Sequence, residues 1–339
     1  MQSYNEVLKK LGTKRSHLLL GNGFSIACNK VFSYGSLFTK AVEKGLSKNA
    51  IDVFERIGTN NFEGVMHLLE KSDWVGKTYN LIPDDSEKIL EDVDLIKKTL
   101  IEAIAESHLE MPSDVSDESY KKAVSFFSSY FNIFTTNYDL LPYWIDMKDT
   151  IPDKYQDGFR TDIDNPLADY VIFSEHTGSK KGLFFLHGAL HLYQISGEVR
   201  KHCWERSGIR LIERIKDGLK KKEYPLFVAE GSCEKKLEQI NQSSYLSYCY
   251  GKLKRVQNSI VVYGSSLGDN DKHIIDAIAE NREVDQIFIG IYGESNIKEK
   301  IQIEKMADYL MNRRLTVDSK KPIKIEYYDS STVEVWKKT

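Results

Sequence analysis

The chain has 339 residues, 41% of them hydrophobic, and a formal net charge of −3 at pH 7, so it can bury one large core, or one core with a sizeable subdomain. The small net charge excludes a global attraction to nucleic acid or membranes and leaves only local basic patches open. The four cysteines form no CxxC pair, which argues against a zinc ribbon and a disulfide framework. No apolar run approaches the ~20 residues that span a bilayer, and no signal-peptide pattern is present, so a soluble cytoplasmic protein is expected.

The first predicted strand is the apolar run at 17–20, which ends in the glycine turn GNGFS at 21–25. A short amphipathic helix is expected before it, at 3–12. Two glycines let the backbone approach a phosphate closely, and a helix that starts near Ser25 offers free N–H groups. The dinucleotide fingerprint G-x-G-x-x-G is not met because Ile26 holds the third glycine position, and a structural turn explains the motif equally well.

A long helical block is predicted between this turn and the next strand, at 36–130. Segments 51–70 and 120–130 fit helices, and the clearest helix has apolar residues spaced by three and four: Ile89, Val93, Ile96, Leu100 and Ile104. Residues 61–63 either lean over a cleft or simply start a helix, and the second interpretation is favoured. We interpret the block as a helical insertion or lid within a single domain that spans 1–339.

The stretch FNIFTTNYDLLPY at 131–143 predicts a buried strand that ends in a polar cluster. Ligands of open α/β sheets bind beyond the carboxyl ends of the strands, so Thr136, Asn137 and Asp139 are candidates for a site. Taken alone, the stretch is also explained by Thr and Asn acting as helix caps.

Five further strands are predicted, at 183–186, 224–229, 259–263, 285–292 and 323–328, whereas 150–180 is expected to be irregular. Helical patterns, such as the one at 234–256, alternate with the strands. This alternation predicts an α/β fold with a Rossmann-like, doubly wound, mostly parallel sheet of about six to seven strands. The residues that follow each strand then gather at one edge of the sheet, where they suit a dinucleotide.

The motifs GNGFS, TTNYD, LHG and GSSL, in this order and each after a predicted strand, resemble the sirtuin-like superfamily over about 17–330. The chain departs from protein deacylases because 26–35 contain no G-I-P-D-F-R loop, Thr136 replaces the usual Gln, and no four-cysteine zinc module is present. It resembles the bacterial sirtuin-like NADases of antiphage defence. The segments FVAEGSCEKKLEQINQSSYL and VVYGSSLGDND resemble a stand-alone bacterial family of roughly this length.

This resemblance implies an NAD+ glycohydrolase that makes nicotinamide and ADP-ribose and depletes NAD in abortive-infection defence. It implies that Asn137 contacts the nicotinamide ribose and the attacking water. His187 would act as a general base, and Asp139 would bind the carboxamide or fix its own loop. The alternatives are a capping role for Asn137 and a buried, hydrogen-bonded role for His187. His191 is expected to be structural because no third metal ligand is evident, and no metal is expected.

The resemblance also implies the nucleotide contacts. The pyrophosphate would be cradled by Gly21, Asn22, Gly23, Phe24 and Ser25, and Thr136 is a further candidate for cofactor binding. The adenine-side ribose would lie by Gly264, Ser265 and Ser266, and Asp329 would close that end. Tyr34 and Ser36 stand where the deacylase loop is missing and are candidates for the nicotinamide pocket.

Other functions remain open at this stage. The first alternative is a non-catalytic sensor of NAD or an ADP-ribose derivative. A protein deacylase or ADP-ribosyltransferase is disfavoured by the missing zinc module and loop, and a dehydrogenase by the incomplete fingerprint. A homo-oligomer and an activating phage or host protein are the expected partners, and neither membrane nor nucleic-acid binding is expected.

Overall fold

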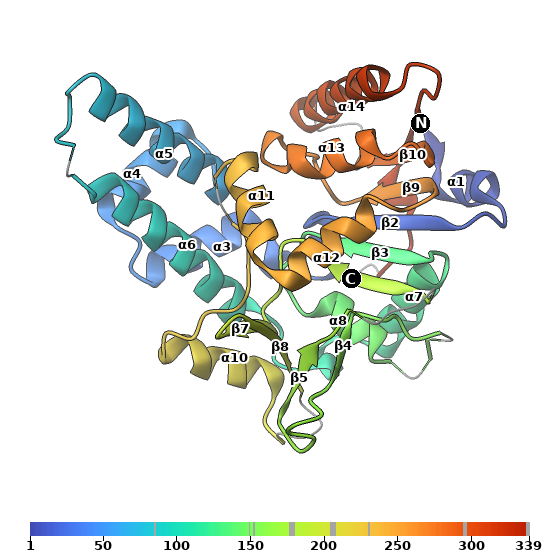
Figure 1. The fold of residues 1–339 in the computed structure, drawn as a ribbon, viewed down its shortest axis with the longest axis horizontal. Coiled ribbons are helices and arrows are strands. Elements are labelled where there is room, and N and C mark those ends of the chain that lie inside the picture. Colours follow the sequence, from blue (N-terminus) through green and yellow to red (C-terminus); the bar gives the residue numbers. More distant parts are fainter. Residues whose placement is uncertain are drawn as a thin grey trace.

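A seven-stranded parallel sheet organises the described part of the chain (Figure 1). The computed structural model describes residues 1–84, 86–148, 150–151, 153–175, 180–203, 208–229, 231–293 and 297–336. In spatial order the strands are β1 (Gln2–Ser3), β11 (Lys324–Asp329), β10 (Val284–Ile291), β9 (Asn258–Tyr263), β2 (Ser16–Leu20), β3 (Asn132–Thr135) and β6 (Gly182–Phe185). Every neighbouring pair runs parallel.

The order of the strands reverses between β2 and β9. From β2 the chain continues to β3 and β6 on one side, and it later returns to β9, β10 and β11 on the other side of β2. Ligands of open α/β sheets bind in the crevice outside the carboxyl ends of the strands at such a switch point. The topology therefore predicts a site beyond Leu20 and Tyr263, where β2 and β9 end.

Helices supply most of the remaining described structure (Figure 1). Before β3 lie α1 (Tyr4–Leu11), α2 (Gly23–Cys28), η1 (Lys30–Phe32), α3 (Tyr34–Glu43), α4 (Lys48–Ile57), α5 (Phe62–Thr78), α6 (Lys88–Ser107), η2 (Pro112–Asp114) and α7 (Asp117–Ser128). After β3 lie α8 (Leu141–Asp146), α10 (Leu211–Lys220), α11 (Cys233–Gln242), α12 (Ser244–Leu253), η3 (Asp269–Asp271), α13 (Lys272–Glu280), α14 (Ile297–Val317) and η4 (Ser330–Thr332). Among the described helices, none has both the length and the apolar character needed to cross a membrane.

Helices cover both faces of the large sheet, as the register of the strands demonstrates. Phe184 of β6 lies in the same row as Val262 of β9, and its ring centroid is 6.0 Å from that of Tyr248 on α12. Tyr263 follows Val262 and therefore points to the opposite face. There its ring centroid lies 5.5 Å from that of Phe126 on α7. This is the doubly wound, Rossmann-like α/β fold that the sequence predicts.

The described residues between β2 and β3 are helical wherever they form regular structure, and α3, α4, α5 and α6 form a lobe beside the sheet (Figure 1). The apolar face predicted for α6 packs against α3 and α5 and includes the buried residues Val93, Ile96, Leu100 and Ile104. Side-chain oxygens of Ser33, Ser47 and Asn61 cap α3, α4 and α5. The interpretation of this block as an insertion or lid stays a prediction.

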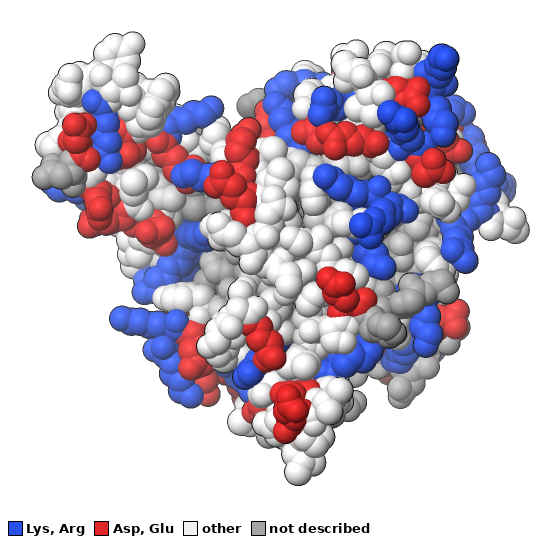
Figure 2. All heavy atoms as spheres, viewed as in Figure 1, with Lys and Arg blue, Asp and Glu red and all other residues white. Residues whose placement is uncertain are grey.

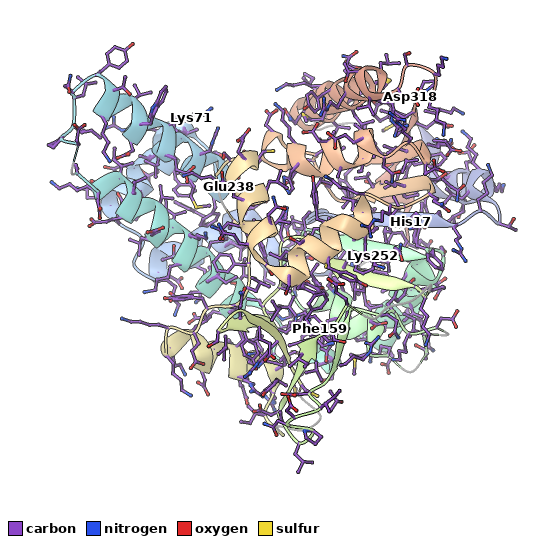
Figure 3. All side chains as sticks on the ribbon, viewed as in Figure 1. His17, Lys71, Phe159, Glu238, Lys252 and Asp318 are labelled. Carbon is purple, nitrogen blue, oxygen red and sulfur yellow. The ribbon has the colours of Figure 1, made fainter. Side chains whose placement is uncertain are left out.

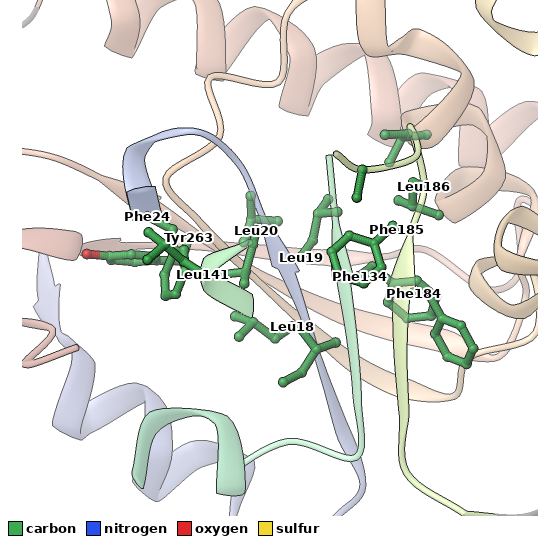
Figure 4. Packing of buried hydrophobic residues seen from close by; sticks show 14 of the residues in the cluster. Leu18, Leu19, Leu20, Phe24, Phe134, Leu141, Phe184, Phe185, Leu186 and Tyr263 are labelled. Atoms are coloured by element: carbon green, nitrogen blue, oxygen red, sulfur yellow. The ribbon is translucent and has the colours of Figure 1, made fainter. Parts of the chain in front are cut away.

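The core of the sheet consists of apolar runs rather than of alternating apolar and polar residues (Figure 4). In β2, Leu18, Leu19 and Leu20 are all almost fully buried. Phe134 of β3 stacks on Phe184 of β6, with ring centroids 5.2 Å apart. Continuous burial is expected for parallel strands with helices on both faces, and it explains why the sequence shows these strands clearly.

The expectation of irregular structure at 150–180 was wrong in part. The strands β4 (Phe159–Thr161) and β5 (Tyr170–Phe173) join β8 (Glu198–His202) and β7 (Leu192–Ile195) in an antiparallel sheet of order β4-β5-β8-β7. These strands have three to five residues and mostly intermediate burial, so they carry neither a long apolar run nor a clear alternation.

The prediction of a strand at 224–229 was also wrong. The described residues there form only an isolated bridge, between Gly188 and Phe227. Their backbone pairs with the turn after β6: Ala189 N–H donates to Leu226 C=O at 3.0 Å, and Val228 N–H donates to His187 C=O at 2.9 Å. Val228 and Ala229 are buried and Leu226 and Phe227 are half-buried, but the run covers a turn instead of extending a sheet. The helix predicted at 234–256 is two helices, because Ser243 ends α11 and caps α12.

Candidate functional site

A cavity of about 910 Å³ lies beyond the carboxyl ends of the central strands, where the reversal of strand order predicts a site. Most of the predicted site residues line it: Gly21, Asn22, Gly23, Thr136, Asn137, Asp139, His187, Gly264, Ser265 and Ser266. Phe24, Ser25 and Asp329 are not among its lining residues. Four motifs that are far apart in the sequence therefore share one cavity.

The two glycine turns lock against each other at the edge of this cavity. Gly21 N–H donates to Tyr263 C=O at 3.0 Å, and Gly23 N–H donates to Gly264 C=O at 2.8 Å. A Cβ on Gly21 would lie 2.6 Å from the carbonyl oxygen of Gly264, and a Cβ on Gly23 would lie 2.7 Å from its Cα. Gly264 has a φ of +69°, which favours glycine. Contact between the turns thus explains these glycines, and their contact with pyrophosphate stays a prediction.

Phe24 and Ser25 lie beneath the turn, and Asp329 caps a different one. The ring centroid of Phe24 is 5.0 Å from that of Trp336, whose Nε1–H donates to Phe24 C=O at 2.9 Å. Asp329 accepts the N–H of Ser331 at 2.9 Å. The contacts of Phe24 and Asp329 support the walls of the site, and direct nucleotide contacts stay a prediction for all three residues.

Asn137 is held by a chain of hydrogen bonds below the cavity. Its Nδ2 donates to Gly21 C=O at 3.1 Å and to Ser25 Oγ at 2.8 Å. Ser25 Oγ in turn donates to Asp139 Oδ2 at 2.5 Å, and Asp139 Oδ1 accepts the N–H of Leu141 at 2.9 Å. Asp139 therefore fixes its own loop and orients Asn137 through Ser25. A direct catalytic role for Asp139 stays a prediction.

The amide oxygen of Asn137 has no hydrogen-bond partner among the described residues, although the residue is only 5% exposed. The carbonyl of Gly21 only accepts hydrogen bonds, so it fixes the amide nitrogen on its side and leaves Oδ1 free. A buried acceptor without a partner is costly unless water or a ligand satisfies it. Asn137 also lines the cavity, so a hydroxyl group or water bound there can satisfy Oδ1.

His187 follows β6 and is 2% exposed. Its Nε2 lies 3.0 Å from Nε2 of His273. Burial is the largest cause that lowers the pKa of His187 well below 6.5, and Lys236 lowers it further. Gly188 follows with a φ of +81°, and a Cβ there would lie 2.0 Å from the carbonyl oxygen of Leu226. In the HG pair, His187 is thus a neutral imidazole, and position 188 must be glycine because the backbone of Leu226 leaves no room for a side chain.

A buried ion cluster adjoins His187. Lys236 of α11 is 0% exposed, and its Nζ lies 2.8 Å from Glu63 Oε2 and 3.0 Å from Asp271 Oδ1. Both carboxylates line the cavity. Asp271 Oδ1 also lies 3.9 Å from His187 Nε2. Burial alone would raise the pKa of Asp271, but Lys236 and then the two histidines outweigh it and lower the pKa to about 2.

The ligand atoms of His187, Asp271 and His273 lie within 4.8 Å of one another, close enough for one metal ion. However, the ammonium of Lys236 already forms an ion pair with Asp271, and the Nε2 atoms of the two histidines share a hydrogen bond. A divalent cation at this place would have to displace or repel the lysine. We therefore assign no metal to this group.

His191 lies outside the cavity lining and is fully buried. Its ring stacks on Tyr143 with centroids 4.8 Å apart and meets the ring of Phe185 edge-on at 5.1 Å. Burial lowers its pKa well below the ordinary value. These contacts agree with the structural role expected from the sequence.

Residues 18–336 match a protein family that is described as "Domain of unknown function (DUF4917)". The chain belongs to this family. A search of curated proteins gives no match. The DUF4917 span includes every described residue that lines the cavity.

Within the DUF4917 span, the helical block contributes more to the site than the sequence indicated. Phe62 and Glu63 line the cavity while Asn61 caps α5, so both interpretations of 61–63 apply. Tyr34 lines the cavity, whereas Ser36 hydrogen-bonds to Ser33 at the start of α3.

Sequence reasoning gave no role to Lys236, Asp271 or His273. One signal was present: Lys236 lies four residues before Ile240, on the buried face of α11, whereas its neighbour Lys235 points outward. The pairing of Lys236 with distant carboxylates has no signature in the chain order. Only the packing of α5, α11 and η3 brings the three charges together.

Proposed function

We propose that the chain is an NAD+ glycohydrolase that cleaves the nicotinamide–ribose bond and releases nicotinamide and ADP-ribose. The observation that carries the proposal is the Oδ1 of Asn137, which has no hydrogen-bond partner among the described residues and is buried beside a cavity at the switch point of the sheet. The cavity is large enough for a dinucleotide-sized ligand, since ligand pockets measure about 300–1,000 Å³.

The reaction needs an ordered water, an oriented ribose and a leaving group that departs neutral. Water supplies the hydroxyl at ribose C1′, and nicotinamide leaves with the electron pair of the broken C–N bond. Asn137 Oδ1 accepts a hydrogen bond from the water or from a ribose hydroxyl, which holds the reacting atoms in line. Neutral His187 takes the proton that the water or the hydroxyl releases.

The charge of the site suits this reaction. The nicotinamide of NAD+ is cationic, and the transition state places positive charge on the ribose. Glu63 and Asp271 line the cavity, while Lys236 lies fully buried behind them. Carboxylates on the cavity wall favour developing positive charge in a partly dry site.

The proposal is tested by incubating purified protein with NAD+ and following nicotinamide and ADP-ribose by chromatography. His187→Ala should lower the rate by roughly 10²- to 10⁴-fold, and Asn137→Ala by about 10²-fold or more, because the reacting atoms lose their alignment. Asn49→Ala, at an exposed position of α4, is the matched control and should keep the wild-type rate.

Undiminished release in both site variants would overturn the assignment of the site. Binding of NAD+ without release, measured by calorimetry, would favour the sensor of NAD or an ADP-ribose derivative. Release of nicotinamide with transfer of ADP-ribose to a protein would favour the ADP-ribosyltransferase.

NAD depletion in antiphage defence, a homo-oligomer and an activating phage or host partner belong to the same proposal. Cells that express the chain should lose NAD+ after phage infection, and cells with Asn137→Ala should not. Light scattering after size-exclusion chromatography measures the oligomer directly. If infected cells that express the wild-type chain keep their NAD+, the defence role is contradicted for the phage tested.

A further inference from the structure

The ion cluster of Lys236, Glu63 and Asp271 joins three separate parts of the fold. Glu63 lies at the start of α5, Lys236 on α11 and Asp271 at the end of η3. Figure 3 marks α5 by Lys71 and α11 by Glu238. The face shown in Figure 2 mixes both charge signs over these helices, but Lys236 itself is fully buried.

A buried lysine needs a specific reason, because the loss of hydration disfavours its charged form. Burial lowers the pKa of Lys236, but Asp271 and Glu63 outweigh burial and raise the pKa above the ordinary value. Lys236 therefore stays an ammonium ion at the back of the cavity. Its position between two carboxylates makes it the central charge of the cluster.

The cluster continues into a pair of imidazoles. Asp271 Oδ1 is 3.0 Å from Lys236 Nζ and 3.9 Å from His187 Nε2, which in turn is 3.0 Å from His273 Nε2. Two neutral imidazoles can share such a hydrogen bond, because one ring donates its N–H and the other accepts it. Two imidazolium rings cannot, since both nitrogens would then carry protons.

We propose that Lys236 is a positioning residue that binds Asp271 and thereby keeps the His187–His273 pair neutral and hydrogen-bonded. The catalytic consequence rests on the proposed function, because it needs His187 as the base. The protonation of the pair itself is a property of the protein without substrate.

The groups around the pair account for this effect. His187 faces Lys236 from α11, Asp271 from η3 and His273 from α13, while Glu63 from α5 acts through Lys236. The Cys233 thiol lies against the backbone of His273 and adds no charge, because burial raises its pKa. Without Lys236, the negative charge of Asp271 would stand uncompensated beside His187 and would favour an imidazolium.

The test is an NMR titration of protein with ¹³C-labelled histidine in the absence of NAD+, with His187 assigned through His187→Gln. In the wild type, the titration midpoint of His187 should lie well below 6.5. In Lys236→Met it should rise by about one pH unit or more. Lys235→Met is the matched control: it lies on the same helix, its Nζ is 2.8 Å from Glu70, and its side chain is 50% exposed. It should leave the midpoint unchanged.

A second variant covers the case in which Lys236→Met does not fold. The double variant Lys236→Met/Glu63→Gln removes one charge of each sign and leaves Asp271 beside His187. It should show the same rise in the midpoint. An unchanged midpoint in a folded variant, or an equal rise in Lys235→Met, would overturn the inference. A purely structural lysine would lower the melting temperature without moving the midpoint.

The pH dependence of NAD+ cleavage gives the functional readout. The base must be neutral, so activity in the wild type should persist as the pH falls below 6.5. In Lys236→Met, activity should be lost at higher pH than in the wild type, and Lys236→Arg should restore the wild-type profile by restoring the charge. If the wild type releases no nicotinamide, either alone or with a lysate of phage-infected cells, the proposed function fails, whereas the NMR titration still decides the role of Lys236.

Discussion

At the residue scale, the orientation of Asn137 depends on side chains from two other places in the chain. Ser25 and the carbonyl of Gly21 hold its amide nitrogen, and Asp139 holds Ser25. The orientation of Asn137 in the TTNYD motif therefore depends on the glycine turn GNGFS. A substitution at Ser25 or Asp139 acts on Asn137 even though neither side chain needs to touch a ligand.

Asp139 should give the protein a characteristic dependence of stability on pH. Burial raises the pKa of Asp139 from 3.8 to about 6, although hydrogen bonds from Ser25 and Leu141 oppose the rise. Between these two values the folded state binds more protons than the unfolded state, so stability falls as the pH rises through this window. The full difference corresponds to about 3 kcal/mol.

Urea unfolding of the wild type and of Asp139→Asn, from about pH 4 to pH 7, measures this contribution. The wild type should lose stability relative to the variant as the pH rises, because only the wild type has to ionise a buried carboxyl. A constant difference between the two proteins across this range would contradict the prediction.

At the element scale, the two glycine turns form one unit that places the ends of β2 and β9. Hydrogen bonds link Gly21 to Tyr263 and Gly23 to Gly264. Trp336, near the C-terminal end of the described chain, packs on Phe24 just below the first turn. Backbone contacts between Gly23 and Gly264, which are about 240 residues apart in the sequence, thus fix the edge of the cavity.

Gly264→Ala should lower the free energy of unfolding by about 2 kcal/mol or more, because it combines a strained φ with a clash. A Cβ there would lie 2.5 Å from the backbone nitrogen of Phe24. Gly12→Ala separates the two causes, since its φ is +57° and no described atom lies within 4 Å of a Cβ there. Gly251→Ala on α12, where no described atom lies within 4 Å of the added Cβ, should stabilise the helix by roughly 0.5–1 kcal/mol.

Chemical denaturation of these three variants measures the effects. Gly12→Ala should lose less stability than Gly264→Ala. Equal losses of stability would show that the backbone angle alone accounts for the effect and that the contact with Phe24 adds nothing to it.

At the scale of the whole molecule, the cavity is built from the sheet edge and from the helical block together. The sheet contributes Asn137 and His187, and the block contributes Glu63, Leu100 and Ile104. Lys236 ties these parts together through buried ion pairs. A ligand in the cavity should therefore affect both parts at once.

ADP-ribose, the proposed product, should bind without being cleaved and should protect both parts from hydrogen exchange. Amides at 21–29, at 135–139 and at 62–65 should be protected, whereas α10, which contributes no residue to the cavity lining, should not change. Free ADP-ribose at about 100 times its Kd should raise the free energy of unfolding by about 2.7 kcal/mol. Protection that is confined to α10 and the small antiparallel sheet would place the ligand elsewhere.

The central strands of the large sheet were predictable because buried parallel strands appear as continuous apolar runs, such as 17–20 and 259–263. The two-residue edge strand β1 was not predicted. The run at 224–229 has the same apolar sequence but covers the turn at Gly188, and an apolar run alone does not distinguish the two cases. The short strands β4 and β5 were missed because partial burial leaves no periodic signal.

The sequence by itself determined the fold class and the polar residues that end the strands, because parallel sheets place those residues at one edge. Tertiary structure alone decided that Phe24 and Ser25 lie below the cavity, that Asp139 acts through Ser25, and that Lys236 joins Glu63 to Asp271. The physical reason is the range of the interactions. Local patterns encode the period of an element and the residue at its end, whereas hydrogen bonds and buried ion pairs depend on which distant elements pack together.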